Sequence, residues 1–336
     1  MRKNICAGWI FLSGLLFLGC ENSKEAVAAE NPSSVQEKVI SSEEIEISEA
    51  EVAATLNYLS SDELQGRKTG TAGIEKAAKF IENVFRENKI EPYYATYRDS
   101  FMVNGTTGYN LIGLKKGSDP KLKNEYIIIG AHYDHVGINK TESKDSIFNG
   151  ANDNASGVTA VLEMAKYFAD VDTKRSILFV LFSAEEMGLL GSEHLAKRLK
   201  KEELDLYLML NLEMLGIPME GKDYRAYLTG YDISNLAETI NKYSGEKLLG
   251  SLPQAKTYNL FNRSDNATFF QEFHVPAQTI STFDFTNFEY YHHENDEAQL
   301  MNVPFMTELI EDLIPAISKI ANSITREIKV SKWAEI

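Results

Sequence analysis

Residues 126–134, YIIIGAHYD, contain a short apolar run that leads directly into a histidine and an aspartate. Two later stretches have the same form, because ILFVLFSAEE at residues 177–186 and LYLMLNLE at residues 206–213 also end in acidic side chains. Continuous apolar runs of this length are typical of strands that are buried on both faces of a sheet. Helical patterns separate them, at residues 156–168 and near residues 189–200. The alternation predicts an α/β fold with a mostly parallel mixed sheet sandwiched between helices.

The alternation continues in both directions along the chain. Toward the N-terminus, amphipathic helices are expected at residues 49–60 and 73–88, on either side of the loop SSDELQGRKTGT, and a strand at residues 109–115 follows. Toward the C-terminus we expect strands at residues 226–230 and 277–283, and helices at about residues 234–243 and 304–326. Sheet-based catalytic domains often reach about 250 residues as one unit. Residues 49–330 are therefore predicted to form a single catalytic domain.

Composition excludes several classes of protein. The chain of 336 residues is 43% hydrophobic and 25% charged, which is the composition of a globular protein rather than a disordered one. It has 49 acidic and 34 basic residues, a net charge of −15, and no basic patch. An acidic surface repels phosphate backbones, so nucleic acid is not expected as a partner.

The first twenty residues have the pattern of a secretory signal. Arg2 and Lys3 precede an apolar run from Ala7 to Leu18, and Gly19-Cys20 follows. The segment resembles a bacterial lipoprotein signal, in which Cys20 would carry the lipid; the alternative is a signal that is cut elsewhere, with Cys20 incidental. Residues 21–48 are polar and acidic and predict a flexible tether. We therefore expect an exported protein, lipid-anchored to the bacterial cell envelope on the periplasmic or outer-membrane side, which contacts the membrane only through this anchor.

Side chains that bind metals follow the predicted strands. In open α/β sheets, ligands bind beyond the carboxyl ends of the strands, so these residues are expected at one rim of the sheet. His132 and Asp134 form an H-x-D pair, in which the histidine can bind a metal while the carboxylate orients its ring. Asp153, within NGANDNASG, could bridge two metal ions from a rigid turn. The alternatives are a polar cap at the strand end for His132 and a tight turn that caps a helix for Asp153.

The remaining acidic candidates also have two interpretations each. Glu185 and Glu186 can divide a site between them, one as a metal ligand and the other as a group that moves protons, or they can form an exposed acidic turn. Glu213 ends an apolar stretch, where an unpartnered carboxylate is costly, so it needs either a metal ion or an unrecognised lysine or arginine. His292, His293 and Asp296 complete the set, while His135 is interpreted as structural.

In chain order, the motifs HYD, NGANDNASG, SAEE, NLEMLG and YHHEND resemble those of the co-catalytic zinc aminopeptidase family. That family includes the bacterial leucyl aminopeptidases, with glutamate carboxypeptidases and glutaminyl cyclases as relatives. The resemblance runs from about Val52 to the last helix, and the early stretch LSSDELQGRKTGTAG is also similar to bacterial members. Two positions depart from the family: Glu213 stands where Asp is common, and Glu294 stands where a proline often lies.

The resemblance implies a role for each residue of the rim. It implies that His132 and Glu213 bind one zinc ion, that Glu186 and His292 bind a second, and that Asp153 bridges the two through a loop with a cis peptide after it. It also implies that Glu185 is the general base and that Asp134 supports the ring of His132.

The expected function is hydrolysis of peptide bonds by a di-zinc aminopeptidase. Mn²⁺ or Co²⁺ could replace zinc at mixed histidine and carboxylate ligands. The substrate is a peptide, and a monomer is preferred. Two alternative functions remain: a zinc-dependent glutaminyl cyclase with one zinc ion, and a non-catalytic binding ectodomain of the same fold.

Overall fold

The structure is a computed structural model of the chain and describes residues 45–139 and 146–332. The predicted signal of residues 1–20, with Cys20, lies outside the described residues, as does most of the predicted tether. Ile45 is buried, and the backbone N–H of Ile47 donates to the side chain of Glu311 at 2.8 Å. The chain therefore packs on the folded domain a few residues before Ser48.

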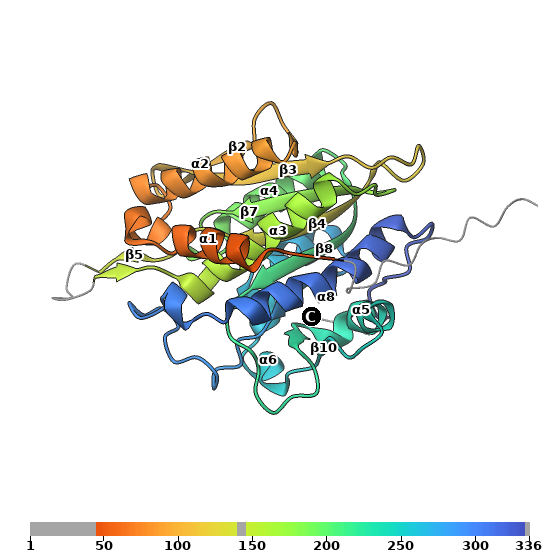
Figure 1. Cartoon of the computed structure of the whole chain (residues 1–336). Helices are drawn as coiled ribbons and strands as arrows, with labels where there is room; N and C mark the ends of the chain where they lie inside the picture. The colour runs from red at the N-terminus through yellow and green to blue at the C-terminus, as the bar shows by residue number, and fades with distance from the viewer. Residues whose placement is uncertain (1–44, 140–145, 333–336) are drawn as a thin grey trace, which may run out of the picture. The chain divides into compact units, whose positions relative to one another are not determined.

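A nine-stranded mixed sheet lies at the centre of the domain (Figure 1). Strands β7, β4, β8 and β11 are mutually parallel, whereas β3 joins β7, and β9 joins β11, in antiparallel register. The prediction of a mostly parallel mixed sheet is confirmed. The strands lie in the order β1 (Glu91–Pro92), β3 (Thr106–Lys115), β7 (Ser176–Phe182), β4 (Glu125–His132), β8 (Asp205–Glu213), β11 (Ala277–Ser281), β9 (Ala226–Leu228) and β10 (Leu249–Gly250), and β2 (Arg98–Val103) pairs with β3.

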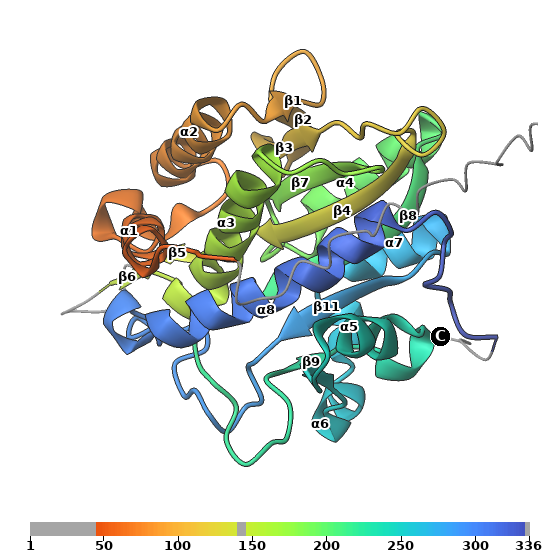
Figure 2. The same cartoon turned by 45° about the vertical axis from the view of Figure 1, so that its right-hand side comes forward.

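Helices cover both faces of this sheet (Figure 2). One face packs against α1 (Glu49–Leu59), α2 (Ala72–Glu87), α3 (Gly157–Ala169) and α8 (Val303–Asn322), with α5 (Leu236–Ser244) packed on α8. The other face packs against α4 (Leu190–Lys201) and α7 (Asn266–Phe273). The smaller elements are the hairpin of β5 (Gly137–Ile138) and β6 (Ile147–Phe148), the short helix α6 (Pro253–Thr257), and the turns η2 (Asp62–Arg67), η3 (Ala151–Ser156), η4 (Tyr231–Ile233), η5 (Leu260–Arg263) and η6 (Ala298–Leu300).

Local sequence explains why the predicted helices form. In α2, Ile74, Ala77, Ile81 and Phe85 recur at helical spacing and are all buried. In α1, the Ser48 side chain accepts a hydrogen bond from the backbone N–H of Glu51, which satisfies one of the free donors at the helix start. The last helix ends at Asn322, a few residues before the predicted end.

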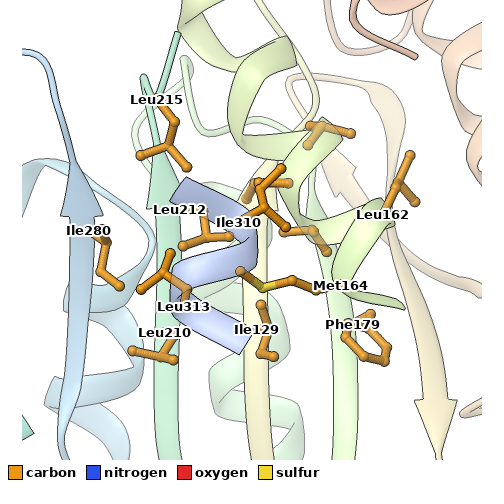
Figure 3. Close-up of a cluster of buried hydrophobic side chains, with 14 of the residues drawn as sticks. Ile129, Leu162, Met164, Phe179, Leu210, Leu212, Leu215, Ile280, Ile310 and Leu313 are labelled. Atoms are coloured by element: carbon orange, nitrogen blue, oxygen red, sulfur yellow. The ribbon is translucent and has the colours of Figure 1, made fainter. Parts of the chain in front are cut away.

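The continuous apolar strands have a core on each side. In β4, Ile127 and Ile129 pack in the core under α3 and α8, while Ile128 between them packs in the core under α4 and α7. Figure 3 shows Ile129 and Leu210 beside Met164 of α3 and Leu313 of α8. Each such aliphatic side chain stabilises the folded state by about 1.5–3 kcal/mol when it is fully buried. The two cores hold the parallel strands in fixed register.

That register brings the carboxyl ends of the central strands to one rim. His132 at the end of β4 is paired with Phe182 at the end of β7, and Glu213 at the end of β8 is paired with Ser281 at the end of β11. The side chains that follow these strands therefore start from neighbouring points.

Candidate metal centre

The predicted metal ligands come together in two groups at this rim. One consists of His132, Asp153 and Glu213, and the other of Asp153, Glu186, His292 and His135; within each group the ligand atoms lie within 4.8 Å of one another. Asp153 belongs to both groups. Two cations bound there would share its carboxylate, which is the arrangement that a bridging ligand requires.

His132 is completely buried, and its two ring nitrogens have different environments. Nδ1 lies 3.1 Å from the backbone carbonyl of Asp134, and because a carbonyl can only accept, this nitrogen carries the proton. Nε2 is left without a hydrogen bond, 3.2 Å from Asp153 Oδ1 and 3.8 Å from Glu213 Oε1. A buried ring nitrogen that faces two carboxylates and has no hydrogen bond is suited to bind a metal ion once it gives up its proton.

The side chain of Asp134 differs from the expectation. Its carboxylate lies 3.8 Å from His132 Nδ1, and it accepts instead from the backbone N–H of Glu185 at 3.1 Å and from the hydroxyl of Thr69 at 3.3 Å. The reason is that the strand ends at His132, so the chain turns and offers its carbonyl rather than its side chain to the ring. Asp134 supports His132 through its backbone and fixes Glu185 through its carboxylate.

Asp153 lies in the irregular turn η3, and the peptide bond that follows it is cis, as the resemblance implied. Asp296 holds this turn, since its two carboxylate oxygens accept from the backbone N–H groups of Asn152 at 2.7 Å and Asp153 at 3.0 Å. Asn154 ties the turn to β8, because its amide donates to the carbonyl of Leu212 at 3.0 Å. Asp296 is thus a support of the Asp153 backbone and belongs to neither ligand group.

The adjacent glutamates have different surroundings. Glu186 Oε1 lies 2.9 Å from His135 Nδ1, and Glu186 Oε2 lies 3.0 Å from His292 Nε2. The carboxylate of Glu185 makes no hydrogen bond or ion pair with the described residues, and burial raises its pKa well above the usual value. The chain turns sharply here, with Ala184 at φ +59°, so both side chains can reach one site.

Glu213 has no lysine or arginine partner in the described parts of the chain. Its Oε2 accepts from the hydroxyl of Ser264 and from the amide of Asn211 at 3.3 Å, while its Oε1 points toward His132. Of the two interpretations of this carboxylate, the structure favours a cation at its free oxygen.

The two adjacent histidines also differ. His292 Nε2 lies 3.2 Å from Asp153 Oδ2. By contrast, His293 Nδ1 lies 3.5 Å from Glu294 Oε2 and accepts a hydrogen bond from the backbone N–H of Asn295. The imidazole of His292 is 36% exposed, so this part of the site is open to solvent.

Sequence reasoning missed two residues of the site, His135 and Arg67. His135 was interpreted as structural, yet its Nδ1 faces Glu186 and lies 3.8 Å from Asp153 Oδ2. The residue follows β4 by three positions in a turn, so strand periodicity gave no sign of where its ring points.

Arg67 lies in the loop before α2 and is almost completely buried. Its guanidinium donates to the carbonyls of Tyr133 at 3.0 Å, Asn149 at 2.6 Å and Gly150 at 2.9 Å, and also to that of Leu59. Tyr133 lies between His132 and Asp134, and Gly150 precedes the turn of Asp153. The arginine therefore joins the two segments that carry His132 and Asp153, two of the three residues of the first ligand group.

Electrostatics at the rim favours bound positive charge. Burial lowers the pKa of His292, but contacts with Asp153 and Glu186 outweigh it and raise that pKa to about 10. Burial raises the pKa of Asp153, but His132 and His292 hold it well below its usual range. A carboxylate field that retains protons on imidazoles also attracts a divalent cation, which would displace those protons. The donor set of imidazole nitrogens and carboxylate oxygens fits zinc.

The sequence has relatives among metallopeptidases. Residues 110–314 match the family described as Peptidase family M28. Aminopeptidase YwaD of Bacillus subtilis is 35% identical over 144 residues, which cover 42% of this chain and 29% of the relative. Leupeptin-inactivating enzyme 1 of Streptomyces exfoliatus is 31% identical over 208 residues, 60% of this chain and 42% of the relative. The chain thus matches less than half the length of either relative.

Solved structures share the fold. The LapA aminopeptidase of Legionella pneumophila superposes with a TM-score of 0.65 at 21% identity, covering 83% of this chain and 73% of that one. A glutaminyl cyclase of Porphyromonas gingivalis superposes with a TM-score of 0.64 at 17% identity, covering 81% and 98%. Together these matches confirm the predicted fold and the resemblance seen in the motifs.

Proposed function

The chain belongs to peptidase family M28, and from this premise we propose that it is a zinc aminopeptidase that releases amino-terminal residues from peptides with the help of two metal ions. The observation that carries the proposal is the difference between the adjacent glutamates. Glu186 contacts two histidines, whereas the Glu185 carboxylate at the same rim has no hydrogen bond or ion pair with any residue that the structure describes. One is suited to hold a cation and the other to move a proton.

Bound zinc would polarise a peptide carbonyl and lower the pKa of a water molecule. His132 and Glu213 would hold one ion, Glu186 and His292 the other, and Asp153 both, while His135 orients Glu186. Glu185 takes the proton of the attacking water and then delivers it to the leaving amine. The hydrogen bond from its backbone N–H to Asp134 keeps Glu185 next to the segment that carries His132.

Paired substitutions test this division of roles. Glu185→Gln should keep the metal content of the wild type but lose peptide hydrolysis by about 10²–10⁴-fold. Glu186→Gln should lose bound metal as well as activity. Metal is counted by mass spectrometry, turnover is measured with aminoacyl chromogenic substrates, and Glu193→Gln on the exposed face of α4 is the matched control. Retained turnover in Glu185→Gln would show that the base is another group.

Metal stoichiometry separates the peptidase from a glutaminyl cyclase of the same fold. The two ligand groups around Asp153 support two zinc ions per chain. A single zinc ion with cyclisation of amino-terminal glutamine would favour the cyclase instead. A non-catalytic binding ectodomain is the weaker rival, because a candidate residue is present for each ligand and for the base.

The proposal includes export and a lipid anchor at Cys20, with a monomer that contacts the membrane only there. The supporting observation is the signal pattern of residues 1–20. Within the described parts of the chain, no helix has the length and apolar character needed to cross a bilayer. Detergent phase partitioning of the expressed full chain tests the anchor: the wild type should enter the detergent phase and Cys20→Ala should not. Equal partitioning of the two would exclude lipidation at this cysteine.

A further inference from the structure

A small cavity of about 60 Å³ adjoins the candidate metal centre. Its lining includes Glu213, a predicted metal ligand, and Tyr291, the neighbour of His292. Phe283 and Phe285 contribute apolar surface, and Thr229 contributes a hydroxyl. A group that reacts at the metal centre could therefore place an attached side chain in this cavity.

The lining contains one cationic residue, Arg263. Its guanidinium is exposed and has no hydrogen bond, ion pair or aromatic ring contact with any described residue. Each of the seven other arginines within residues 45–139 and 146–332 makes at least one such contact. Arg67 and Arg86 also lack a carboxylate partner, but their guanidinium groups donate to backbone carbonyls and to Asn83, whereas no contact of Arg263 is found within the described residues. Arg263 has five donors available for a ligand.

The backbone of Arg263 is held in a defined place. It is the last residue of η5, and the next residue, Ser264, donates its hydroxyl to Glu213. Phe261, two positions earlier, is buried and packs edge-on against Phe270 with ring centroids 5.4 Å apart. The backbone from which the Arg263 side chain extends is therefore fixed relative to both the metal centre and the core.

The chemistry of this cavity fits a short acidic side chain. A guanidinium pairs with a carboxylate through two parallel hydrogen bonds, and the aromatic walls suit the methylene groups that precede the carboxylate. A cavity of this volume holds a few water-sized groups, which is enough for a carboxylate and the methylene groups before it. Glu213 is the only acidic residue in the lining, and a bound cation would engage its charge.

We propose that this cavity receives the side chain of the substrate's amino-terminal residue, and that Arg263 makes the enzyme selective for peptides that begin with glutamate or aspartate. The inference rests on the proposed aminopeptidase function and adds the substrate class to it.

Kinetics with a panel of substrates tests the selectivity. Glutamyl, aspartyl, leucyl and lysyl p-nitroanilides are compared for the zinc-loaded wild-type protein, Arg263→Leu and Arg263→Glu. We expect kcat/KM of the wild type to be highest for the acidic substrates. Arg263→Leu should lower it for these two by about tenfold or more while changing the leucyl substrate little. Arg263→Glu should shift the preference toward the lysyl substrate. Lys256→Leu, which removes an exposed cation outside this cavity, is the matched control.

Binding of the free amino acids provides a second readout that does not require hydrolysis. Calorimetry should show that L-glutamate binds the wild-type protein more tightly than L-leucine, and that Arg263→Leu removes the difference. If no aminoacyl substrate is cleaved but this binding pattern holds, the aminopeptidase function fails and the acidic-ligand site stands. If leucyl substrates are cleaved best, or Arg263→Leu affects every substrate equally, the selectivity proposal is overturned and the peptidase stands. Absence of any preference for glutamate in both assays also overturns it.

Discussion

Replacement of Arg67 by methionine is a demanding test of how the metal centre is built. Methionine is an unbranched apolar side chain that can fill part of the buried space of Arg67, but it cannot donate to the carbonyls of Leu59, Tyr133, Asn149 and Gly150. Burial lowers the pKa of Arg67 to about 10, and Asp296 and Asp153 oppose that lowering, so the guanidinium is charged at neutral pH. The substitution therefore removes a buried charge together with its hydrogen bonds.

The expected loss of stability is large. A hydrogen bond from a charged donor contributes about 1.5–3 kcal/mol, and a carbonyl left buried without a donor costs about 1–3 kcal/mol. The four contacts share one side chain, so their effects do not add, and removal of a buried ionic partner typically costs about 3–5 kcal/mol. We expect Arg67→Met to lower the free energy of unfolding by an amount in that range. Arg67→Lys keeps the charge, but its single ammonium group cannot reach the carbonyls that the planar guanidinium contacts together. This variant should therefore recover only part of the lost stability.

Urea titration at constant temperature measures the difference in the free energy of unfolding between the wild type and Arg67→Met. The comparison requires that the slope of this free energy against urea concentration is the same for both proteins. Lys68→Met, on the exposed neighbouring residue, is the matched control and should change stability by less than about 0.5 kcal/mol. Zinc retention under a chelator provides a second readout, because Arg67 joins the segments of His132 and Asp153. A loss below about 1 kcal/mol in Arg67→Met would refute the argument.

Two further predictions concern pH and metal. Burial raises the pKa of Asp99, but contacts with His194, Asn110 and Arg198 outweigh it and hold the pKa below its usual 3.8. Its charge therefore stabilises the fold above about pH 4, and this contribution is lost as the pH falls through the folded-state pKa. Asp99→Asn should lower stability by about 1–3 kcal/mol at pH 7, with the difference from wild type narrowing only below about pH 4 in urea titrations; identical curves at pH 7 would contradict this. Chelation should lower the melting temperature measured by circular dichroism, and zinc at a thousand times its Kd should restore about 4 kcal/mol of stability. A melting curve that does not respond to zinc would argue against the metal centre.

The parts of the fold that sequence predicted are those in which burial is complete. Strands β4, β7 and β8 are apolar along their length because both faces meet a core, so their hydropathy identifies them directly. Strand β2 was missed because its residues Arg98 and Asp99 are polar although Asp99 is fully buried. Helix α7 was missed as well, since its eight residues offer barely two turns of pattern.

At the rim, sequence could predict which residue types gather but not how each is oriented. His132, Glu186 and Glu213 lie at or just after the ends of neighbouring parallel strands, so their proximity follows from topology. Asp153 reaches the same rim from the turn η3, which is not part of the central sheet. The supports could not be predicted in this way. Arg67 contacts residues as many as 83 positions away, and the carboxylate of Asp134 turns toward Glu185 only because the chain leaves the extended conformation after His132.

The candidate ligands are widely separated in the sequence, and this separation determines at which stage of folding the site can form. The first candidate ligand in the sequence is His132 and the last is His292. The parallel strands β4, β7, β8 and β11 lie at or between these two positions. During synthesis the amino-terminal segments emerge first, so the centre is completed only after β11 has joined β8 and the following loop has closed over the rim. Under the proposed roles, metal would bind late, to a domain whose central strands are already assembled.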